Sequence, residues 1–180
     1  MNQKLLIYRI KKGNKQALEE LIHRFYPDIY RYIYLKLTIK EDAKDLCQEV
    51  FVRFIHQIPM YRDNGKLINY LYTIAYSVCM DYFRKQKFLD DFEEYENQIP
   101  DSKNLHDDVL KQIQSELLQK LLIELSLSEQ DVIVFHFYQQ LTFKEIASIL
   151  NEPEETIKSR YYRALRKLRT MWKEVYDDES

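Results

Sequence analysis

The spacing of apolar residues is the feature that most restricts the fold of this chain. Apolar side chains recur at intervals of three and four over residues 14–37, 41–58, 68–87 and 110–125, which is the period of amphipathic helices. Only two glycines and four prolines in 180 residues are available for tight turns. An all-α fold is therefore predicted, with Asn14 as the N-cap of a long first helix and Pro27 as a candidate kink.

The net charge of −2 averages over blocks of opposite sign. Residues 1–87 contain 16 Lys and Arg against 9 Asp and Glu, and residues 153–173 contain 7 against 2. Between them, residues 88–116 contain 2 basic and 9 acidic residues, and the apolar periodicity fades from 88 to 108. Two small helical domains, residues 1–87 and 110–175, are predicted, joined by an acidic, flexible linker at 88–109.

The sequence contains no recognisable pattern for catalysis, metal binding or a membrane span. Cys47 and Cys79 form no CxxC motif, and the four histidines are scattered. There is no phosphate-binding loop and no nucleophile paired with a base. No apolar run approaches the roughly 18 residues of a membrane helix, and the N-terminus lacks the apolar core of a signal peptide. We expect no catalytic residue, metal, cofactor or membrane insertion, and a cytoplasmic location.

Residues 142–169 have the helix start and stop signals of a helix-turn-helix. Thr142 and Glu145 are spaced as a capping box, as are Ser128 and Asp131 before the preceding helix. Asn151 can take the left-handed conformation that ends a helix. Pro153 suits the first turn of the helix that follows.

The second helix of this motif has an apolar stripe and an opposite polar face. The stripe consists of Ile157, Tyr161, Ala164, Leu165, Leu168 and Trp172. The polar face includes Lys158, Ser159, Tyr162, Arg163 and Arg166. Such a face fits the DNA major groove, where Arg and Lys can bond guanine. The alternative is an ordinary solvated basic helix in a bundle.

Three segments together resemble a known family. They are EDAKDLCQEVFVRFI at 41–55, YLYTIAYSVCMDYFRKQK at 70–87 and TFKEIASILNEPEETIKSRYYRALRKLR at 142–169. In order and spacing they resemble regions 2 and 4 of the extracytoplasmic-function (ECF) branch of bacterial sigma factors, over most of residues 5–172. The resemblance implies a factor that binds core RNA polymerase and directs it to promoter DNA, while the polymerase supplies the enzymatic activity.

The resemblance also implies three sets of site residues. The helix with the DLxQEVF pattern binds the clamp helices of the largest polymerase subunit in this family, and the matching residues are Asp45, Gln48 and Glu49. Contact with the unpaired minus-ten element falls on Tyr61, Arg62, Asp63, Asn64, Gly65, Lys66, Tyr70, Arg84 and Lys85. Contact with the minus-thirty-five duplex falls on Thr156, Lys158, Ser159, Arg160, Tyr162, Arg163 and Arg166.

The expected partners are the clamp helices, the flap of the second-largest polymerase subunit and promoter DNA. An anti-sigma factor, which could retain the protein at the membrane, is a further candidate. The chain departs from the family at Tyr70, where Trp is usual, and at Ser77, where Asn is common. Two other functions are open: a stand-alone helix-turn-helix regulator with an N-terminal sensing or interaction domain, and a protein-binding adaptor, against which the basic face argues.

Overall fold

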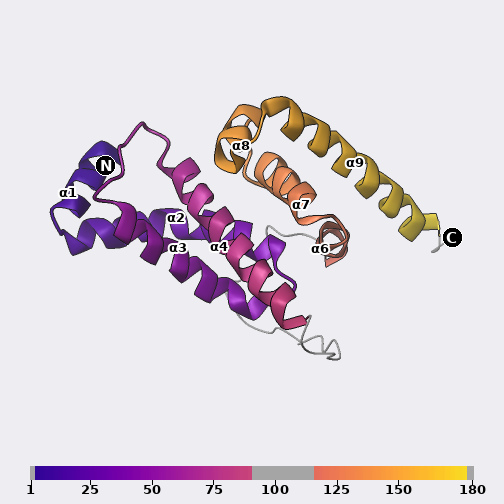
Figure 1. The fold of residues 1–180 in the computed structure, drawn as a ribbon, viewed down its shortest axis with the longest axis horizontal. Coiled ribbons are helices and arrows are strands. Elements are labelled where there is room, and N and C mark those ends of the chain that lie inside the picture. Colours follow the sequence, from indigo (N-terminus) through magenta and orange to yellow (C-terminus); the bar gives the residue numbers. More distant parts are fainter. Residues whose placement is uncertain (1–2, 91–115, 178–180) are drawn as a thin grey trace. The chain divides into compact units, whose positions relative to one another are not determined.

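The structure, a computed structural model, describes residues 3–90 and 116–177, and every element in these ranges is helical (Figure 1). Contacts divide the chain into two units, residues 1–33 with 41–102 and residues 34–40 with 103–180. The all-α prediction is confirmed for the described residues. Most of the predicted linker lies outside them, as do the predicted helical positions Leu110 and Ile113.

The N-terminal half of the chain forms four α-helices and one short 3-10 turn. These are α1 (Gln3–Lys11), α2 (Lys15–Lys36), η1 (Lys40–Asp42), α3 (Ala43–Gln57) and α4 (Leu67–Asp90). The α2 helix continues through Pro27. The α1 helix is an addition to the predicted elements, and its buried residues Leu6, Ile7 and Ile10 lie at helical spacing. The α4 helix runs past its predicted end at Lys87 to Asp90.

The junction of α1 and α2 shows why these helices end and begin where they do. Gly13 has a φ of +79°, a left-handed conformation that glycine adopts without a Cβ clash. The amide of Gly13 donates to the carbonyl of Ile10 at 2.8 Å. Asn14 Oδ1 accepts a hydrogen bond from the amide of Ala17 at 2.8 Å, which confirms the predicted N-cap.

The α3 and α4 helices pack against each other through buried side chains. Val50 and Phe54 of α3 and Leu71 and Val78 of α4 are at most 1% exposed. Cys47 and Cys79 are both buried free thiols, as the sequence predicts. Because this core holds the helix pair, the polar residues on the outer face of α3 keep a defined position.

The C-terminal half forms a second set of helices. These are α6 (Glu116–Ile123), α7 (Leu127–Ile133), the π-helical turn η2 (Val134–Tyr138), α8 (Phe143–Leu150) and α9 (Glu154–Asp177). The α9 helix packs against α6, α7 and α8, with Ile157 and Ala164 fully buried. Pro153 immediately precedes α9.

One of the two predicted capping boxes is correct. Thr142 Oγ1 accepts a hydrogen bond from the amide of Glu145 at 3.3 Å, and the carboxylate of Glu145 accepts one from the amide of Thr142 at 3.0 Å. The prediction of Ser128 with Asp131 is wrong, because α7 begins at Leu127. Glu129 therefore occupies the third helical position and accepts from the amide of Ser126 at 3.1 Å.

The predicted apolar stripe of α9 is wider than the face that is buried. Leu165 is 38% exposed and Trp172 is 41% exposed. At 3.6 residues per turn, these two residues lie about 80° and 60° around the helix from Ile157. They therefore sit at the edge of the packed face, and their assignment to its core is wrong.

Candidate functional site

Hydrogen bonds on both sides of the turn stabilise the helix-turn-helix. Asn151 ends α8 with a φ of 55° and a ψ of 46°, the left-handed conformation predicted for it. Arg160 then donates from both terminal guanidinium nitrogens to the carboxylate of Glu152, at 2.9 and 2.6 Å. This bidentate pair joins the turn to α9 and fixes the angle at which α9 leaves it.

The polar face of α9 is largely exposed, as the sequence predicts. The exposed members of the predicted set are Thr156, Ser159, Tyr162, Arg163 and Arg166. Lys158 is half-buried and pairs with Glu154 at 2.8 Å, a hydrogen bond that raises the pKa of Lys158. Arg160 is paired with Glu152. Arg163 and Arg166, in contrast, are exposed and have no carboxylate partner among the described residues.

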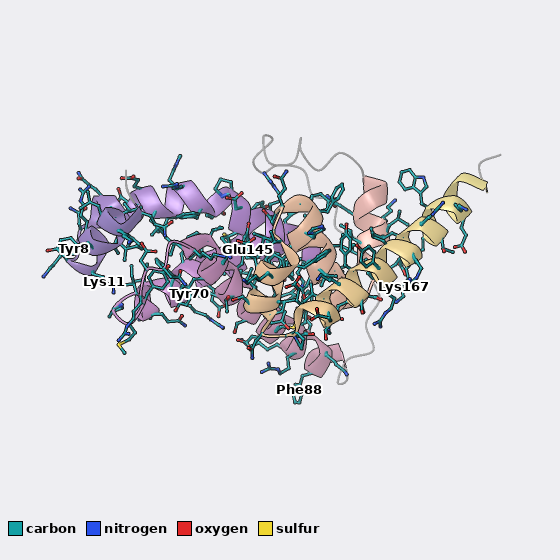
Figure 2. All side chains as sticks on the ribbon, turned by 90° about the horizontal axis from the view of Figure 1, so that it is seen from above. Tyr8, Lys11, Tyr70, Phe88, Glu145 and Lys167 are labelled. Atoms are coloured by element: carbon teal, nitrogen blue, oxygen red, sulfur yellow. The ribbon has the colours of Figure 1, made fainter. Side chains whose placement is uncertain are left out.

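Lys167, which is labelled on α9 in Figure 2, contacts a buried acid of α7. Its ammonium lies 2.9 Å from Oε2 and 2.8 Å from Oε1 of Glu129 in α7. Burial alone would raise the pKa of Glu129, but hydrogen bonds from Lys167 and Ser126 outweigh it and leave the pKa below its ordinary value of 4.5. Lys167 therefore joins α9 to α7.

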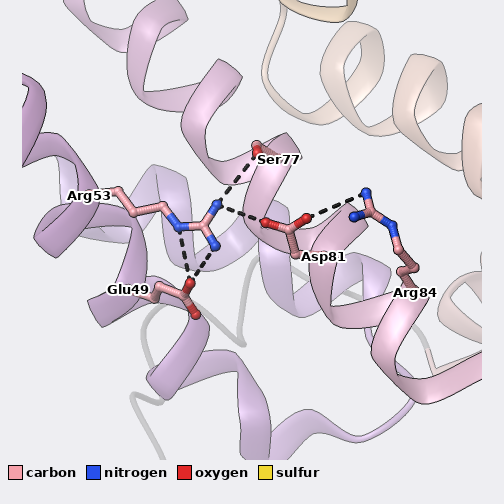
Figure 3. A network of polar contacts seen from close by, with 5 residues as sticks. All are labelled: Glu49, Arg53, Ser77, Asp81 and Arg84. Carbon is pink, nitrogen blue, oxygen red and sulfur yellow. Dashed lines mark hydrogen bonds and ion pairs between the residues drawn. The ribbon is translucent and has the colours of Figure 1, made fainter. Parts of the chain in front are cut away.

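The outer face of α3 presents the residues predicted to meet the polymerase. Asp45 and Gln48 are exposed, and Glu49 is half-buried. Figure 3 shows Glu49 bound by Arg53, which donates from Nε at 3.0 Å and also reaches Asp81 of α4 at 2.9 Å. Although burial opposes its charge, the bonds to Glu49 and Asp81 raise the pKa of Arg53. One residue of the predicted face is thus held in a network.

The loop at residues 59–66 places Tyr61 and Asp63 beside the start of α4. Tyr61 is only 7% exposed, and its ring lies 4.7 Å from that of Tyr70 by centroids. Phe54 lies 6.3 Å from both rings. Burial first, and then the neighbouring Asp63, raises the pKa of Tyr61 to about 12. Tyr61 is therefore a packed member of the loop, whereas Tyr70 is half-buried.

The remaining residues predicted for minus-ten contact fall in two places. Arg62, Asn64, Gly65 and Lys66 are exposed in the loop. Arg84 and Lys85 are exposed near the other end of α4, about 21 Å along the helix axis from Tyr70. Arg84 lies 3.5 Å from Asp81 and so continues the network of Arg53 (Figure 3). The structure therefore arranges this set along α4 and not in one pocket.

Sequence reasoning missed the residues that support these surfaces. Arg53 and Asp81 hold the polar face of α3, and Lys11 and Gln3 of α1 bond to the loop. Their partners lie 28, 50 and 60 positions away along the chain, so no local pattern identifies them. The apolar spacing of Leu6, Ile7 and Ile10 was the available signal for α1 itself.

The described residues contain neither a cluster of metal ligands nor a membrane-spanning helix. No group of three or more His, Cys, Asp or Glu residues in this part of the chain could hold a metal ion. None of the described helices combines the length and apolar character that crossing a membrane requires.

Comparison with protein families identifies both halves of the chain. Sigma-70 region 2 matches residues 21–88, and sigma-70 region 4 matches residues 121–170. The chain is 29% identical over 179 residues to the ECF RNA polymerase sigma factor SigW of Bacillus subtilis, covering 94% of this chain and 96% of SigW. It is 26% identical over 161 residues to the RNA polymerase sigma factor YlaC of the same organism, covering 87% and 92%.

Solved structures show the same fold. The sigma factor RpoE of Bartonella quintana, solved in complex with the anti-sigma factor NepR, matches with a TM-score of 0.69 at 20% identity, covering 86% of this chain and 96% of that one. CnrH, solved in complex with the cytosolic domain of CnrY, matches with a TM-score of 0.65 at 18% identity, covering 94% and 96%. With regions 2 and 4 present in order, the chain belongs to the sigma-70 family and is an ECF-type RNA polymerase sigma factor.

Proposed function

We propose that this ECF sigma factor divides its work among three surfaces. The outer face of α3 binds core RNA polymerase, the loop at 61–66 with the exposed side of α4 meets the minus-ten element, and the polar face of α9 reads the minus-thirty-five element. The observation that carries the proposal is the exposed row of Ser159, Tyr162, Arg163 and Arg166 on a helix-turn-helix that follows a region 2 bundle in one chain.

The α9 face has the chemistry for duplex recognition. Arg163 and Arg166 can donate two hydrogen bonds to guanine or to phosphate, and Ser159 and Tyr162 can bond bases or backbone. Arg160 and Lys167 lie on the flanks and are held by Glu152 and Glu129. We therefore assign Arg160 to holding the turn and not to reading bases.

The α3 face offers acceptors to a basic partner. Asp45 and Gln48 are exposed one turn apart, next to the half-buried Glu49. Acidic and amide oxygens on a surface suit docking to arginine-rich helices. Because Arg53 already neutralises Glu49, Asp45 and Gln48 are the cleaner residues on which to test this surface.

Transcription reconstituted with core polymerase tests the proposal. Promoter-dependent initiation by the wild-type chain is expected, and Asp45→Lys with Gln48→Lys should lower the affinity for core while leaving the helical content unchanged. Lys44→Glu, one residue away on the half-buried flank of α3, is the control for a change of charge. Tight, specific DNA binding by the chain alone, with no effect on initiation by core, would favour the stand-alone regulator instead.

RpoE was solved in complex with the anti-sigma factor NepR. By analogy of fold we propose an anti-sigma factor as a partner here as well. The sigma-70 family is not an enzyme family, and the proposed function requires no catalytic group in this chain.

A further inference from the structure

The loop at residues 59–66 is bound from a helix that lies outside the matched region 2 segment. That segment begins at residue 21, whereas α1 spans Gln3–Lys11. Both ends of α1 contact the loop. In Figure 2, Lys11 and Tyr70 lie at the same end of the first unit, which comprises residues 1–33 and 41–102.

Lys11, at the C-terminal end of α1, bonds the backbone of the loop. Its ammonium donates to the carbonyl of Tyr61 at 2.6 Å and lies 3.4 Å from the carbonyl of Pro59. A charged donor on two carbonyls fixes the path of the chain between them more strongly than a neutral one would. Lys11 thus holds the backbone that carries the Tyr61 ring.

Gln3, at the N-terminal end of α1, bonds a loop side chain. Its Nε2 donates to Oδ1 of Asp63 at 2.7 Å. The same oxygen accepts from the amide of Gly65 at 2.9 Å and faces the Tyr61 hydroxyl at 3.4 Å. Gly65 has a φ of +82°, so the turn at this point uses a conformation that other residues rarely adopt. Gln3 therefore fixes the carboxylate around which the turn is built.

The second carboxylate oxygen of Asp63, Oδ2, is enclosed by the packing of the loop. Oδ2 is buried and has no hydrogen-bond partner among the described residues. An unsatisfied buried acceptor is costly, and it persists only where the surrounding contacts hold it. The contacts that hold Asp63 come from α1 and from the loop itself.

From these contacts we infer that Lys11 and Gln3 are positioning residues for minus-ten recognition, acting through the backbone of Tyr61 and the carboxylate of Asp63. The inference rests on the proposed function of the loop. Exposed Arg62 and Asn64 then meet an unpaired base from a loop already in its binding shape. A preformed loop gives up less conformational freedom on binding and discriminates better between bases.

The test compares variants of the full chain in reconstituted holoenzyme. Lys11→Met removes the donor, Lys11→Arg restores one, and Gln3→Leu removes the bond to Asp63. Lys12→Met is the matched control, because Lys12 is adjacent and its ammonium lies over the ring of Tyr8 at 5.8 Å. The measurements are the affinity ratio for single-stranded minus-ten oligonucleotides with each base substituted, the affinity for core, and amide hydrogen exchange across residues 61–66.

Lys11→Met should lower the affinity ratio at one minus-ten position by about tenfold, the size expected for one charge-assisted bond. Exchange of the loop amides should rise, core affinity should stay the same, and Lys11→Arg should recover most of both effects. Gln3→Leu should lower the affinity ratio at the same minus-ten position by less, since the bond from Gln3 is made by an uncharged donor.

Two outcomes would overturn the inference while wild-type holoenzyme initiates normally. One is a Lys11→Met protein that behaves as Lys12→Met does in both exchange and base preference. The other is faster exchange with an unchanged base preference, which would leave α1 a purely structural role. A wild-type chain that supports no promoter-dependent initiation refutes the proposed function itself, and the two failures are thereby distinguished.

Discussion

The pair of Lys167 and Glu129 allows the stability of the second unit to be predicted from two side chains. The Glu129 side chain is 4% exposed and that of Lys167 is 51% exposed. Lys167→Met keeps the length of the side chain and removes its charge. The buried carboxylate then keeps its hydrogen bonds from Ser126, at 3.1 Å from the amide and 2.8 Å from Oγ, but loses its cation.

The size of the effect lies between two limits. Removing one partner of a fully buried pair costs about 3 to 5 kcal/mol, whereas an exposed pair contributes about 1 kcal/mol or less. Because Lys167 is half in solvent and Ser126 still satisfies the carboxylate, we expect a loss of about 1 to 2 kcal/mol at neutral pH. For a unit of this size, each kcal/mol lowers the midpoint of thermal unfolding by about 4 to 8 °C.

The lowered pKa of Glu129 predicts how the stability difference between wild type and Lys167→Met changes with pH. The pKa of Glu129 is lowered in the folded chain, so its contribution is fully present above the ordinary value of 4.5 and is lost as the pH falls through the lowered value. The stability difference between wild type and Lys167→Met should therefore shrink below pH 4.5. From about pH 5 to neutral pH it should stay constant.

The single tryptophan makes this measurement specific. Trp172 lies in α9, so tryptophan fluorescence reports unfolding of the second unit within the full chain. Arg169→Met removes an exposed charge two positions away and serves as the control. Equal stability of wild type and Lys167→Met across the pH range would refute the reasoning, and Lys167 would then be available for a phosphate contact.

Three further predictions concern the other surfaces. Arg163→Ala should change the ranking of minus-thirty-five variants by about 1 to 3 kcal/mol per contacted base, while Arg169→Ala should mainly reduce the salt dependence; promoter panels at two salt concentrations measure both. Arg160→Met should lower the stability of the second unit by about 1 kcal/mol through loss of its bond to Glu152, as followed by tryptophan fluorescence; unchanged stability would contradict this. Because burial raises the pKa of Tyr61 to about 12, loop packing should persist at pH 10 and weaken toward pH 12, and Tyr61→Phe should reduce this transition when it is followed by near-ultraviolet circular dichroism.

Local signals were sufficient for the parts of the fold that local bonds determine. The turn from Asn151 and the cap at Thr142 could be predicted because each is completed within four residues. The cap of α7 is also local, because Ser126 and Glu129 have the spacing of a capping box. Ser128 and Asp131 have the same spacing two positions later, and choosing this second pair gave the wrong start of the helix. The α3 residues were predicted from the family resemblance of the DLxQEVF pattern, but their link through Arg53 to Asp81 depends on the packing of two helices.

The same distinction changes how the basic charge of α9 should be counted. Residues 153–173 contain seven Lys and Arg, but Lys158, Arg160 and Lys167 each have a carboxylate of this chain within 2.9 Å. The other four are Arg163, Arg166, Arg169 and Lys173. Counting seven phosphate contacts would give a slope of log affinity against log salt of about −6, and counting four gives about −3.6. A pair that stays closed on DNA releases no counterion. The acids that pair with Lys158, Arg160 and Lys167 therefore weaken non-specific attraction without reducing the bonds that Arg163 and Arg166 can make to bases.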